Sequence, residues 1–255
     1  MALLQDKVAI ITGGVTGIGR SIALGMAREG AKICVNHLPT DKQAELAEEM
    51  AQEVGPENFL AVPGDISKQE TSTNLVAEAV KKFGEVNILV SNAGICEFND
   101  FLETKPETYL QTIEINLNGC FFVTQAVGRQ MKKQGKGGSI IGISSISALV
   151  GGGHQAHYTP TKAGILSLMQ SCACALGQYG IRCNALLPGT IRTAVNEEDL
   201  ADDEKRTYME NRTTLGRLGK PDDLAGPAIF LASDLSAYMT GSQLLVDGGL
   251  FVNLQ

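Results

Sequence analysis

Short apolar runs alternate with amphipathic stretches along the whole chain. Runs such as KVAIITG (7–13) and AKICVN (31–36) consist mainly of apolar residues, which is typical of strands that are buried on both faces. The stretches between them repeat apolar residues at helical spacing, as in GIGRSIALGMAREG (17–30). Strands of this kind that alternate with helices indicate a parallel sheet covered by helices on both sides.

The pattern places these elements along the chain without an internal repeat, a low-complexity tract or a linker. It predicts strands over residues 7–13, 31–36, 59–65, 87–94, 139–145, 181–189 and 242–249. It predicts helices over residues 17–30, 41–55, 67–83, 106–134, 156–179 and 221–233, and it leaves a polar segment at 190–219. We therefore expect residues 1–255 to form a single doubly wound α/β domain with a mainly parallel sheet of about seven strands.

Composition agrees with a globular protein and argues against several kinds of partner. Hydrophobic residues make up 44% of the chain and charged residues 19%, which is too little charge for a disordered chain. The net charge is −7, and lysine and arginine form no cluster, so we expect no nucleic-acid partner. A window of about 20 apolar residues and a signal-like N-terminus are both lacking, which predicts a soluble, cytoplasmic protein without a membrane partner.

The cysteines give no sign of a metal site or of a disulfide framework. They are scattered, without a CxxC pair and without a histidine at metal-ligand spacing. We expect thiols that pack as small hydrophobic groups, and no bound metal. The six are Cys34, Cys96, Cys120, Cys172, Cys174 and Cys183.

The first predicted strand runs into the glycine-rich sequence TGGVTGIG (12–19). Gly13, Gly17 and Gly19 are spaced so that the backbone can turn sharply and approach a pyrophosphate before a helix begins. The N–H groups at the start of that helix favour anions. Because strand, glycines and helix occur in the first βαβ unit, the pattern predicts dinucleotide binding by a domain of the Rossmann type.

The GxxxGxG spacing of these glycines resembles that of the short-chain dehydrogenase/reductase family. Other motifs of the family follow in order, namely GDI with Asp65, SNAG (91–94) in place of the more common NNAG, INLNG with Asn116, and PGTIRT (188–193). The resemblance covers almost the whole chain. It implies a cofactor site formed by Gly13, Thr16, Gly17, Ile18, Gly19, Asn36, His37, Asp65, Ile66, Asn92, Ala93, Gly94, Tyr158, Lys162, Pro188, Gly189, Ile191 and Thr193.

The segment SSISALVGGGHQAHYTPTK (144–162) contains the family's catalytic signature. Tyr158 and Lys162 are four residues apart in a predicted helix, so their side chains share one face. Such a pair alone is more often a solvated helix face. Ser145 lies at the end of the preceding strand, and the resulting Ser-x12-Tyr-x3-Lys spacing favours catalysis.

The chemistry of alcohol oxidation explains these residue types. A phenol with a pKa near 10 is mostly protonated at pH 7, and is therefore a poor base on its own. A lysine ammonium and the positive nicotinamide of the oxidised cofactor favour the phenolate, so Tyr158 is the expected proton acceptor. The resemblance implies that Lys162 also binds the nicotinamide ribose, that Ser145 holds the substrate oxygen, and that Asn116 supports a water chain to Lys162.

Residues near the catalytic serine predict the substrate contacts. Besides Ser145 and Tyr158, we expect Ser147, Gln155 and Thr190 to bind substrate hydroxyl groups, although Ser147 and Gln155 also fit a solvated loop. Ser144 is expected to be structural, because consecutive residues on a strand point to opposite faces.

The sequence does not assign a role to several other residues of these loops. Ile95, Cys96, Phe98 and Leu149 are apolar candidates for the substrate site, and the sequence does not place them. His154 and His157 are the residues that a Ser/His hydrolase would use. The chain has no GxSxG nucleophile motif, which argues against hydrolysis.

Cofactor preference depends on the end of the second strand, VNHLPT (35–40). An acidic residue there binds the 2′-hydroxyl of NAD, whereas an arginine accommodates the 2′-phosphate of NADP. Asn36, His37 and Leu38 are neither, and Arg20 lies inside the first helix. We therefore expect use of both NAD and NADP, with NAD slightly favoured.

Three stretches resemble a subgroup of the family more narrowly. Residues 143–171, 181–191 and 244–255 are similar to sugar 1-dehydrogenases that act on L-rhamnose, particularly those of fungi. The resemblance implies oxidation of the C1 hydroxyl of an aldose to a lactone, with L-rhamnose as the expected substrate. It also implies a homotetramer that assembles through the long helices at 106–134 and 156–179.

Two alternatives remain at this point. The first is a carbonyl reductase of the 3-oxoacyl-carrier type, which shares the same catalytic residues. The second is a protein that senses the cofactor without turnover, against which the intact Ser145, Tyr158 and Lys162 argue.

Overall fold

A computed structural model describes residues 2–194, 196–197 and 199–253. All seven strands belong to one parallel sheet with the order β3-β2-β1-β4-β5-β6-β7, as predicted. The strands are β1 (Val8–Thr12), β2 (Lys32–His37), β3 (Phe59–Pro63), β4 (Ile88–Ser91), β5 (Gly138–Ile143), β6 (Ile181–Pro188) and β7 (Gln243–Val246).

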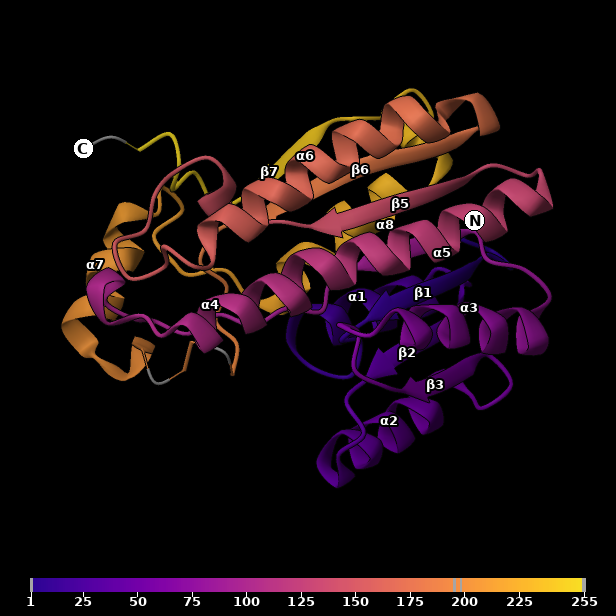
Figure 1. The fold of residues 1–255 in the computed structure, drawn as a ribbon, viewed down its shortest axis with the longest axis horizontal. Coiled ribbons are helices and arrows are strands. Elements are labelled where there is room, and N and C mark those ends of the chain that lie inside the picture. Colours follow the sequence, from indigo (N-terminus) through magenta and orange to yellow (C-terminus); the bar gives the residue numbers. More distant parts are fainter. Residues whose placement is uncertain (1, 195, 198, 254–255) are drawn as a thin grey trace.

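Helices cover both faces of the sheet, so the molecule has three layers (Figure 1). The longer ones are α1 (Gly17–Arg28), α2 (Asp41–Val54), α3 (Gln69–Phe83), α4 (Pro106–Thr112), α5 (Gly119–Gln134), α6 (Thr159–Leu176), α7 (Asp203–Arg212) and α8 (Ala225–Ala232). Short 3₁₀ turns lie at Phe101–Glu103, Ile146–Ala148, Gly177–Tyr179, Asp199–Ala201, Pro221–Leu224 and Asp234–Ser236.

The alternation of side chains along each strand divides the core into two clusters. On β1, Ala9 and Ile11 face α1, α2 and α8, whereas Ile10 faces α3, α5 and α6. All three side chains are fully buried. A strand that is covered on both faces has no polar side, which explains the uninterrupted apolar runs in the sequence.

The helix predicted over 106–134 is not regular throughout. A wide π turn, Ile113–Asn118, joins α4 to α5, and helical backbone angles continue through both junctions. Such turns hold an extra residue and are frequent at functional sites. Hydrophobic periodicity does not reveal them, because the apolar pattern continues on either side.

The polar segment at 190–219 contains a helix that the pattern did not predict. Its helix α7 has no buried residue among its ten positions, so it lacks the apolar stripe by which an amphipathic helix is recognised. Asp202 caps its N-terminus by accepting from the backbone N–H groups of Glu204 and Lys205, a local signal of helix start.

The strand order reverses beside β1, which lies between β2 and β4. In open parallel sheets, ligands bind beyond the carboxyl ends of the strands at such a switch point. Figure 1 shows α7 and the described end of the C-terminal segment grouped at one end of the molecule, where β5 runs into the loop before α6 and β6 runs into the segment before α7.

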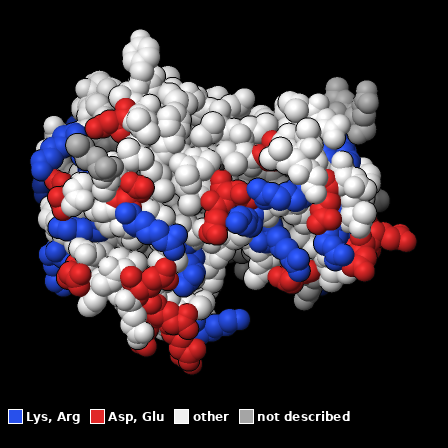
Figure 2. Space-filling model, turned by 180° about the vertical axis from the view of Figure 1, so that it is seen from behind, with Lys and Arg blue, Asp and Glu red and all other residues white. Residues whose placement is uncertain are grey.

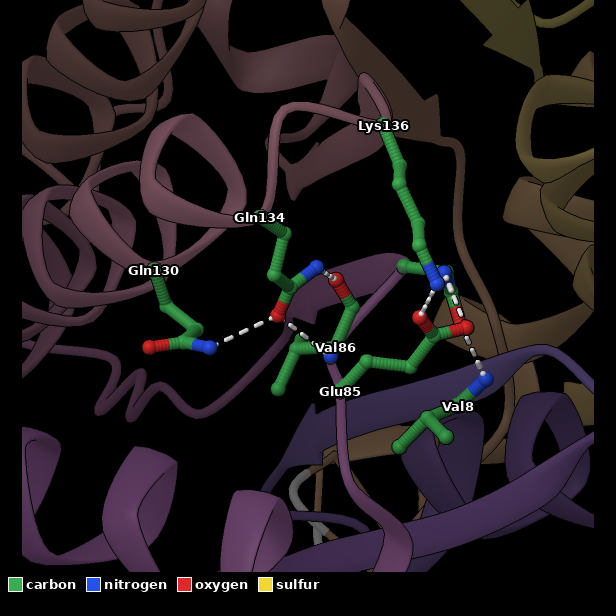
Figure 3. A network of polar contacts seen from close by, with 7 residues as sticks. Val8, Glu85, Val86, Gln130, Gln134 and Lys136 are labelled. Carbon is green, nitrogen blue, oxygen red and sulfur yellow. Dashed lines mark hydrogen bonds and ion pairs between the residues drawn. The ribbon is translucent and has the colours of Figure 1, made fainter.

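A polar network closes the opposite edge of the sheet, where β4 begins (Figure 3). The amide of Gln134 at the end of α5 bonds both the N–H and the carbonyl of Val86, at 2.9 and 2.8 Å. Asn87 accepts from Val8 N–H at 2.7 Å and donates to Glu85, which also pairs with Lys136. The Lys136 contact is the first cause that holds the pKa of Glu85 below its usual value.

Cysteine burial is uneven, and the helices show no membrane-spanning candidate. Cys34, Cys120 and Cys183 are buried in the core as expected, whereas Cys174 is exposed. Within the described part of the chain, every helix is too short or too polar to cross a bilayer.

Asn87 and Lys136 offer a matched test of this edge. Asn87→Ala leaves the buried Val8 N–H without an acceptor, so it is expected to lower the free energy of unfolding by about 1–3 kcal/mol. Lys136→Met removes an ion pair of an exposed lysine, for which the expected loss is below about 1 kcal/mol. Urea denaturation measures both, and an equal loss in the two variants would contradict the assignment.

Candidate active site

A cavity of about 850 Å³ lies at the carboxyl edge of the sheet. Its lining comes from the loops after β1, β2, β3, β4, β5 and β6, from α6 and α7, and from the C-terminal segment. Every residue predicted to bind the cofactor or the substrate lines it, with the exception of Gly19. Among the predicted catalytic residues, Ser145, Tyr158 and Lys162 line the cavity and Asn116 does not.

The glycine turn after β1 fits a pyrophosphate. Gly13 and Gly17 have φ angles of 60° and 51°, which favour glycine. Thr16 makes no side-chain cap at the start of α1, and the first turn contains no acidic residue. Gly17 and Ile18 at that start line the cavity, where the unpaired N–H groups of a first helical turn attract anions.

Gly19 does not line the cavity, and its lack of a side chain is required for packing. A Cβ at this position would lie 2.3 Å from the carbonyl oxygen of Gly13 and 2.5 Å from the Asn92 amide. The helix therefore approaches the preceding turn as closely as it does only because residue 19 is glycine.

Asn92 fastens the glycine turn to the end of β4. Its amide donates to the carbonyls of Thr12 at 2.9 Å and of Gly13 at 3.2 Å. In return, the Thr12 hydroxyl accepts from the backbone N–H groups of Asn92 and Ala93. The two sides of the switch point are thus held together by side chains, and the space between them stays open for a ligand.

Asn36, His37 and Leu38 at the end of β2 line the cavity, and so does Asp65 after β3. Asn36 donates to the carbonyls of Val62 and Gly64, so its amide ties β2 to β3. Gln43 lines this end and accepts from Leu38 N–H at 3.0 Å. Sequence reasoning did not include Gln43, because nothing in the motif marks the first turn of α2.

The end of β5 and the start of α6 hold each other. Ser144 donates its hydroxyl to the carbonyl of Lys162 at 2.7 Å, and the Lys162 ammonium donates to the carbonyl of Ile143 at 3.0 Å. β5 ends at Ile143, so Ser144 lies beyond the strand and lines the cavity. Ser144 is therefore structural, as expected, but the reason is this bond and not a strand face.

Tyr158 and Lys162 are adjacent in the cavity wall. Tyr158 directly precedes α6, and its carbonyl accepts from Lys162 N–H, which places both side chains on one face. The Lys162 nitrogen is 5.4 Å from the centroid of the Tyr158 ring. Helix α6 thus begins at the catalytic pair, three residues later than the predicted start at residue 156.

Burial dominates the electrostatics of this pair. It raises the pKa of Tyr158 above its usual value, with a smaller contribution in the same direction from Cys96, while a hydrogen bond to Ser145 acts to lower it. Burial lowers the pKa of Lys162 to about 8. Burial therefore favours the protonated phenol in the protein alone, and the expected phenolate depends on positive charge from Lys162 and from the bound nicotinamide.

Asn116 lies in the π turn and is fully buried. Its amide accepts from Ile95 N–H at 2.8 Å and donates to Ile95 O and to the Thr161 hydroxyl. A Cβ at Gly94 would lie 3.2 Å from the Asn116 oxygen and 3.6 Å from the Lys162 nitrogen. Asn116 therefore lies near the lysine, and it holds the loop after β4 against α6.

The substrate loop brings several predicted residues together. Ser147 N–H donates to the Ser145 hydroxyl at 3.1 Å, and the Gln155 amide donates to the Cys96 sulfur at 3.2 Å. Ile95, Cys96 and Phe98 line the cavity, as does Thr190 from the opposite wall, whereas Leu149 does not. Leu149 packs instead against the core on the side of α6.

Neither histidine of this loop reaches the cavity. His154 is exposed and pairs with Asp100 at 3.3 Å, while His157 is buried and neither of its ring nitrogens has a hydrogen-bond partner in the described structure. The arrangement thus offers no Ser/His pair for hydrolysis.

The sequence analysis did not predict the wall of the cavity that α7 and the C-terminal segment form. Lys205, Met209 and Arg212 of α7 line it, together with Leu250 and Phe251 near the end of the chain. Their spacing on α7, i, i+4 and i+7, places them on one face. The spacing is visible in the sequence. Because two of the three residues are charged, however, it does not resemble the apolar stripe that predicts a buried helix face.

Comparisons with known proteins identify the family of this chain. A family model described as enoyl-(acyl carrier protein) reductase matches residues 13–251. The chain belongs to the short-chain dehydrogenase/reductase family.

Individual relatives are similar over nearly their whole length. An L-rhamnose-1-dehydrogenase of Scheffersomyces stipitis is 70% identical over 99% of this chain and 99% of its own. An L-rhamnose 1-dehydrogenase (NAD(P)(+)) of Azotobacter vinelandii is 58% identical over 99% and 100%. A crystal structure of a gluconate 5-dehydrogenase from Burkholderia cenocepacia J2315, in complex with NADP and tartrate, has a TM-score of 0.92 and 34% identity, over 98% of this chain and 96% of that one.

The protonated Tyr158 generates a prediction for pH and for mutation. Since the acceptor of a hydroxyl proton must be the phenolate, the rate of alcohol oxidation is expected to rise with pH above neutrality. Tyr158→Phe keeps the ring and is expected to lower kcat by about 10²-fold or more, with cofactor binding retained. Rate assays and fluorescence titration measure both, and a variant that keeps about a tenth of the rate, or about 1.4 kcal/mol, would refute the assignment.

Proposed function

We propose that this protein oxidises L-rhamnose at C1 with NAD or NADP, which yields L-rhamnono-lactone. The supporting observation is the combination of a relative that is 70% identical over nearly the entire chain with a cavity in which Ser145, Tyr158 and Lys162 lie together. A further relative, at 58% identity, is named for the same sugar and for both cofactors.

The side chains divide the chemistry between them in this proposal. The nicotinamide ring of the bound cofactor supplies the acceptor for the hydride that leaves C1. Tyr158 takes the proton of the C1 hydroxyl, and Ser145 holds the oxygen that becomes the lactone carbonyl. Lys162 binds the nicotinamide ribose and adds positive charge beside the phenol, while Asn116 positions the loop at Ile95.

The cofactor fits the residues of the glycine turn and of the adenosine end. Gly13, Gly17 and Ile18 surround the place of the pyrophosphate, and Asp65 lines the end where the family holds the adenine. The Asp65 carboxylate also accepts from Ser67 N–H at 2.9 Å, which fixes its orientation. These residues carry the proposed dinucleotide site.

The choice between the two cofactors follows from charge at the end of β2. No lysine or arginine stands among the described cavity residues of this end, and Arg20 is paired with Glu53 at 3.4 Å. A 2′-phosphate would thus find no lysine or arginine at this end, while Gln43 offers an uncharged amide to a 2′-hydroxyl. We therefore propose use of both cofactors, with NAD slightly favoured.

Other parts of the proposal concern the whole molecule. Exposed apolar side chains gather on the 3₁₀ turn before α4, on α4 itself and on α5, namely Phe101, Leu102, Tyr109, Leu110 and Phe121. Figure 2 shows that the upper part of the rear face, on the side of β6 and β7, is largely uncharged. Both observations support the proposed homotetramer. Measurement of the particle mass in solution tests it. The single domain and the cytoplasmic location remain predictions from the sequence.

Substrate choice is tested with four sugars. L-Rhamnose is expected to give the highest kcat/KM, followed by L-mannose and L-lyxose, with D-glucose poorly used. Each inverted hydroxyl leaves a buried polar group unpaired, which costs about 1–3 kcal/mol. NADH formation at alkaline pH measures the rates. Preference for D-glucose, or reduction of an acetoacetyl thioester without sugar oxidation, would reject the proposal.

Cofactor choice is tested at Leu38, which lines the cavity at the end of β2. Leu38→Arg supplies a guanidinium for the 2′-phosphate, and is expected to raise the ratio of kcat/KM with NADP to that with NAD about tenfold. Leu3→Arg is the matched control, because Leu3 is also partly exposed but lies outside the cavity lining. An unchanged ratio in Leu38→Arg would show that the 2′ position lies elsewhere.

A further inference from the structure

The wall formed by α7 carries two cations that the proposed reaction does not use. Lys205 and Arg212 both line the cavity from the same face of the helix, with Met209 between them. We call Lys205 and Arg212 the α7 cationic pair. A neutral sugar needs hydrogen-bond partners but no positive charge, so this pair points to a substrate of another kind.

Arg212 has a donor without an acceptor. Its Nη2 donates to the carbonyl of Asn253 at 3.1 Å, and the Asn253 amide donates back to the carbonyl of Arg212 at 2.8 Å. Its Nε is buried and has no hydrogen-bond partner in the described structure. A buried donor on a charged group is costly when unpaired, so the guanidinium is held in place with bonding capacity left for a ligand.

Within the cavity lining, the charges at this end favour an anion, because the carboxylates of α7 itself, Asp203, Glu204 and Glu210, are not lining residues. Among the described residues that line the cavity, Asp65 is the one carboxylate. It follows β3, at the adenosine end, whereas α7 belongs to the wall nearest the substrate loop. A negative group beside α7 therefore meets two cations, and the nearest lining carboxylate is at the other end of the cavity.

Phe98 connects this wall to a particular part of the substrate. The Lys205 nitrogen lies 5.2 Å from the centroid of the Phe98 ring, and Phe98 is one of the apolar residues that line the cavity near Cys96. In the proposed reaction, Phe98 is a candidate to contact the methyl group C6 of L-rhamnose. A substituent at C6 that extends past the ring would approach the α7 cationic pair.

We propose that the α7 cationic pair binds a carboxylate at C6, and that the enzyme therefore also oxidises hexuronic acids at C1. This inference rests on the proposed oxidation of L-rhamnose. The C1–H bond breaks with transfer of a hydride to NAD or NADP in its oxidised form, the C1 hydroxyl loses its proton to Tyr158, and the carboxylate is unchanged. The product is the corresponding lactone, with one reduced cofactor and one proton released.

The residue types suit this role. An arginine presents parallel N–H donors that match the two oxygens of a carboxylate, and such pairs are stronger when partly shielded from water. Met209, three residues before Arg212, and Leu250 and Phe251, shortly before its partner Asn253, also line the cavity and supply apolar surface for that shielding. Lys205 adds a second positive charge along the same helix face.

Four substrates that differ only at C5 separate the contributions. L-Lyxose has no substituent there, L-rhamnose has a methyl, L-mannose a hydroxymethyl and L-mannuronate a carboxylate. The wild-type enzyme is expected to oxidise L-mannuronate, and Arg212→Met is expected to lower kcat/KM for it about 30-fold while kcat/KM for L-rhamnose changes less than about threefold. Arg212→Lys is expected to restore part of the loss.

Salt and the chain end provide the controls. Raising NaCl from about 0.02 to about 0.5 M is expected to lower kcat/KM for L-mannuronate several-fold and to leave that for L-rhamnose unchanged. Asn253→Ala removes the hydrogen bond from the Asn253 amide to the carbonyl of Arg212 but keeps the guanidinium. Oxidation of L-mannuronate is therefore expected to persist in this variant. Thermal melting of each variant identifies any loss of folding. If Arg212→Met does not fold, Lys205→Met takes its place in the comparison.

Two results overturn the inference. One is an enzyme that oxidises L-rhamnose but neither oxidises L-mannuronate nor is inhibited by it in competition with L-rhamnose. The other is an equal loss for both substrates in Arg212→Met. An enzyme that oxidises no aldose at all refutes the proposed function instead, so the two failures are distinguishable.

Discussion

The interlock between the end of β5 and the start of α6 determines the geometry of the site. Ser144 bonds the carbonyl of Lys162, and Lys162 reaches back to the carbonyl of Ile143. Both bonds are buried, where competition with water is absent and a broken bond leaves an unpaired polar group. The lysine is thus fixed beside Tyr158 by the same contacts that join strand to helix, so the packing of this crossover and the geometry of the catalytic group depend on the same two bonds.

The same burial opposes formation of the phenolate at Tyr158, which oxidation requires. Removing Tyr158 and Lys162 from water opposes the charged form of both groups, which raises one pKa and lowers the other. The base needed for oxidation is the phenolate. A positive ligand charge in the cavity acts in the direction that the reaction requires, so cofactor binding and activation of the tyrosine are coupled through the electric field.

Much of the fold was predictable because each strand is buried on both faces. An apolar run such as that of β1 leaves no other interpretation once helices alternate with it. The cofactor turn was predictable for a different reason, since Gly13 and Gly17 require positive φ and Gly19 tolerates no Cβ. Features that depend on contacts between residues distant in the sequence could not be predicted from the sequence. The α7 wall has no apolar stripe, and the roles of Gln43 and Arg212 depend on neighbours that only the folded chain brings near.

The π turn that carries Asn116 has a consequence for how this chain can change over evolutionary time. One residue advances an α-helix by about 100°, so an extra residue in the turn shifts the rotational phase of α5 relative to α4. Deleting a residue between Ile113 and Asn118 would restore a regular helix and rotate α4 against a core-packed α5 by roughly that angle. Thr112, the one buried residue of α4, would be turned away from the core. A change in the length of this segment is therefore costly even where a substitution at an exposed position, such as Glu114, is not.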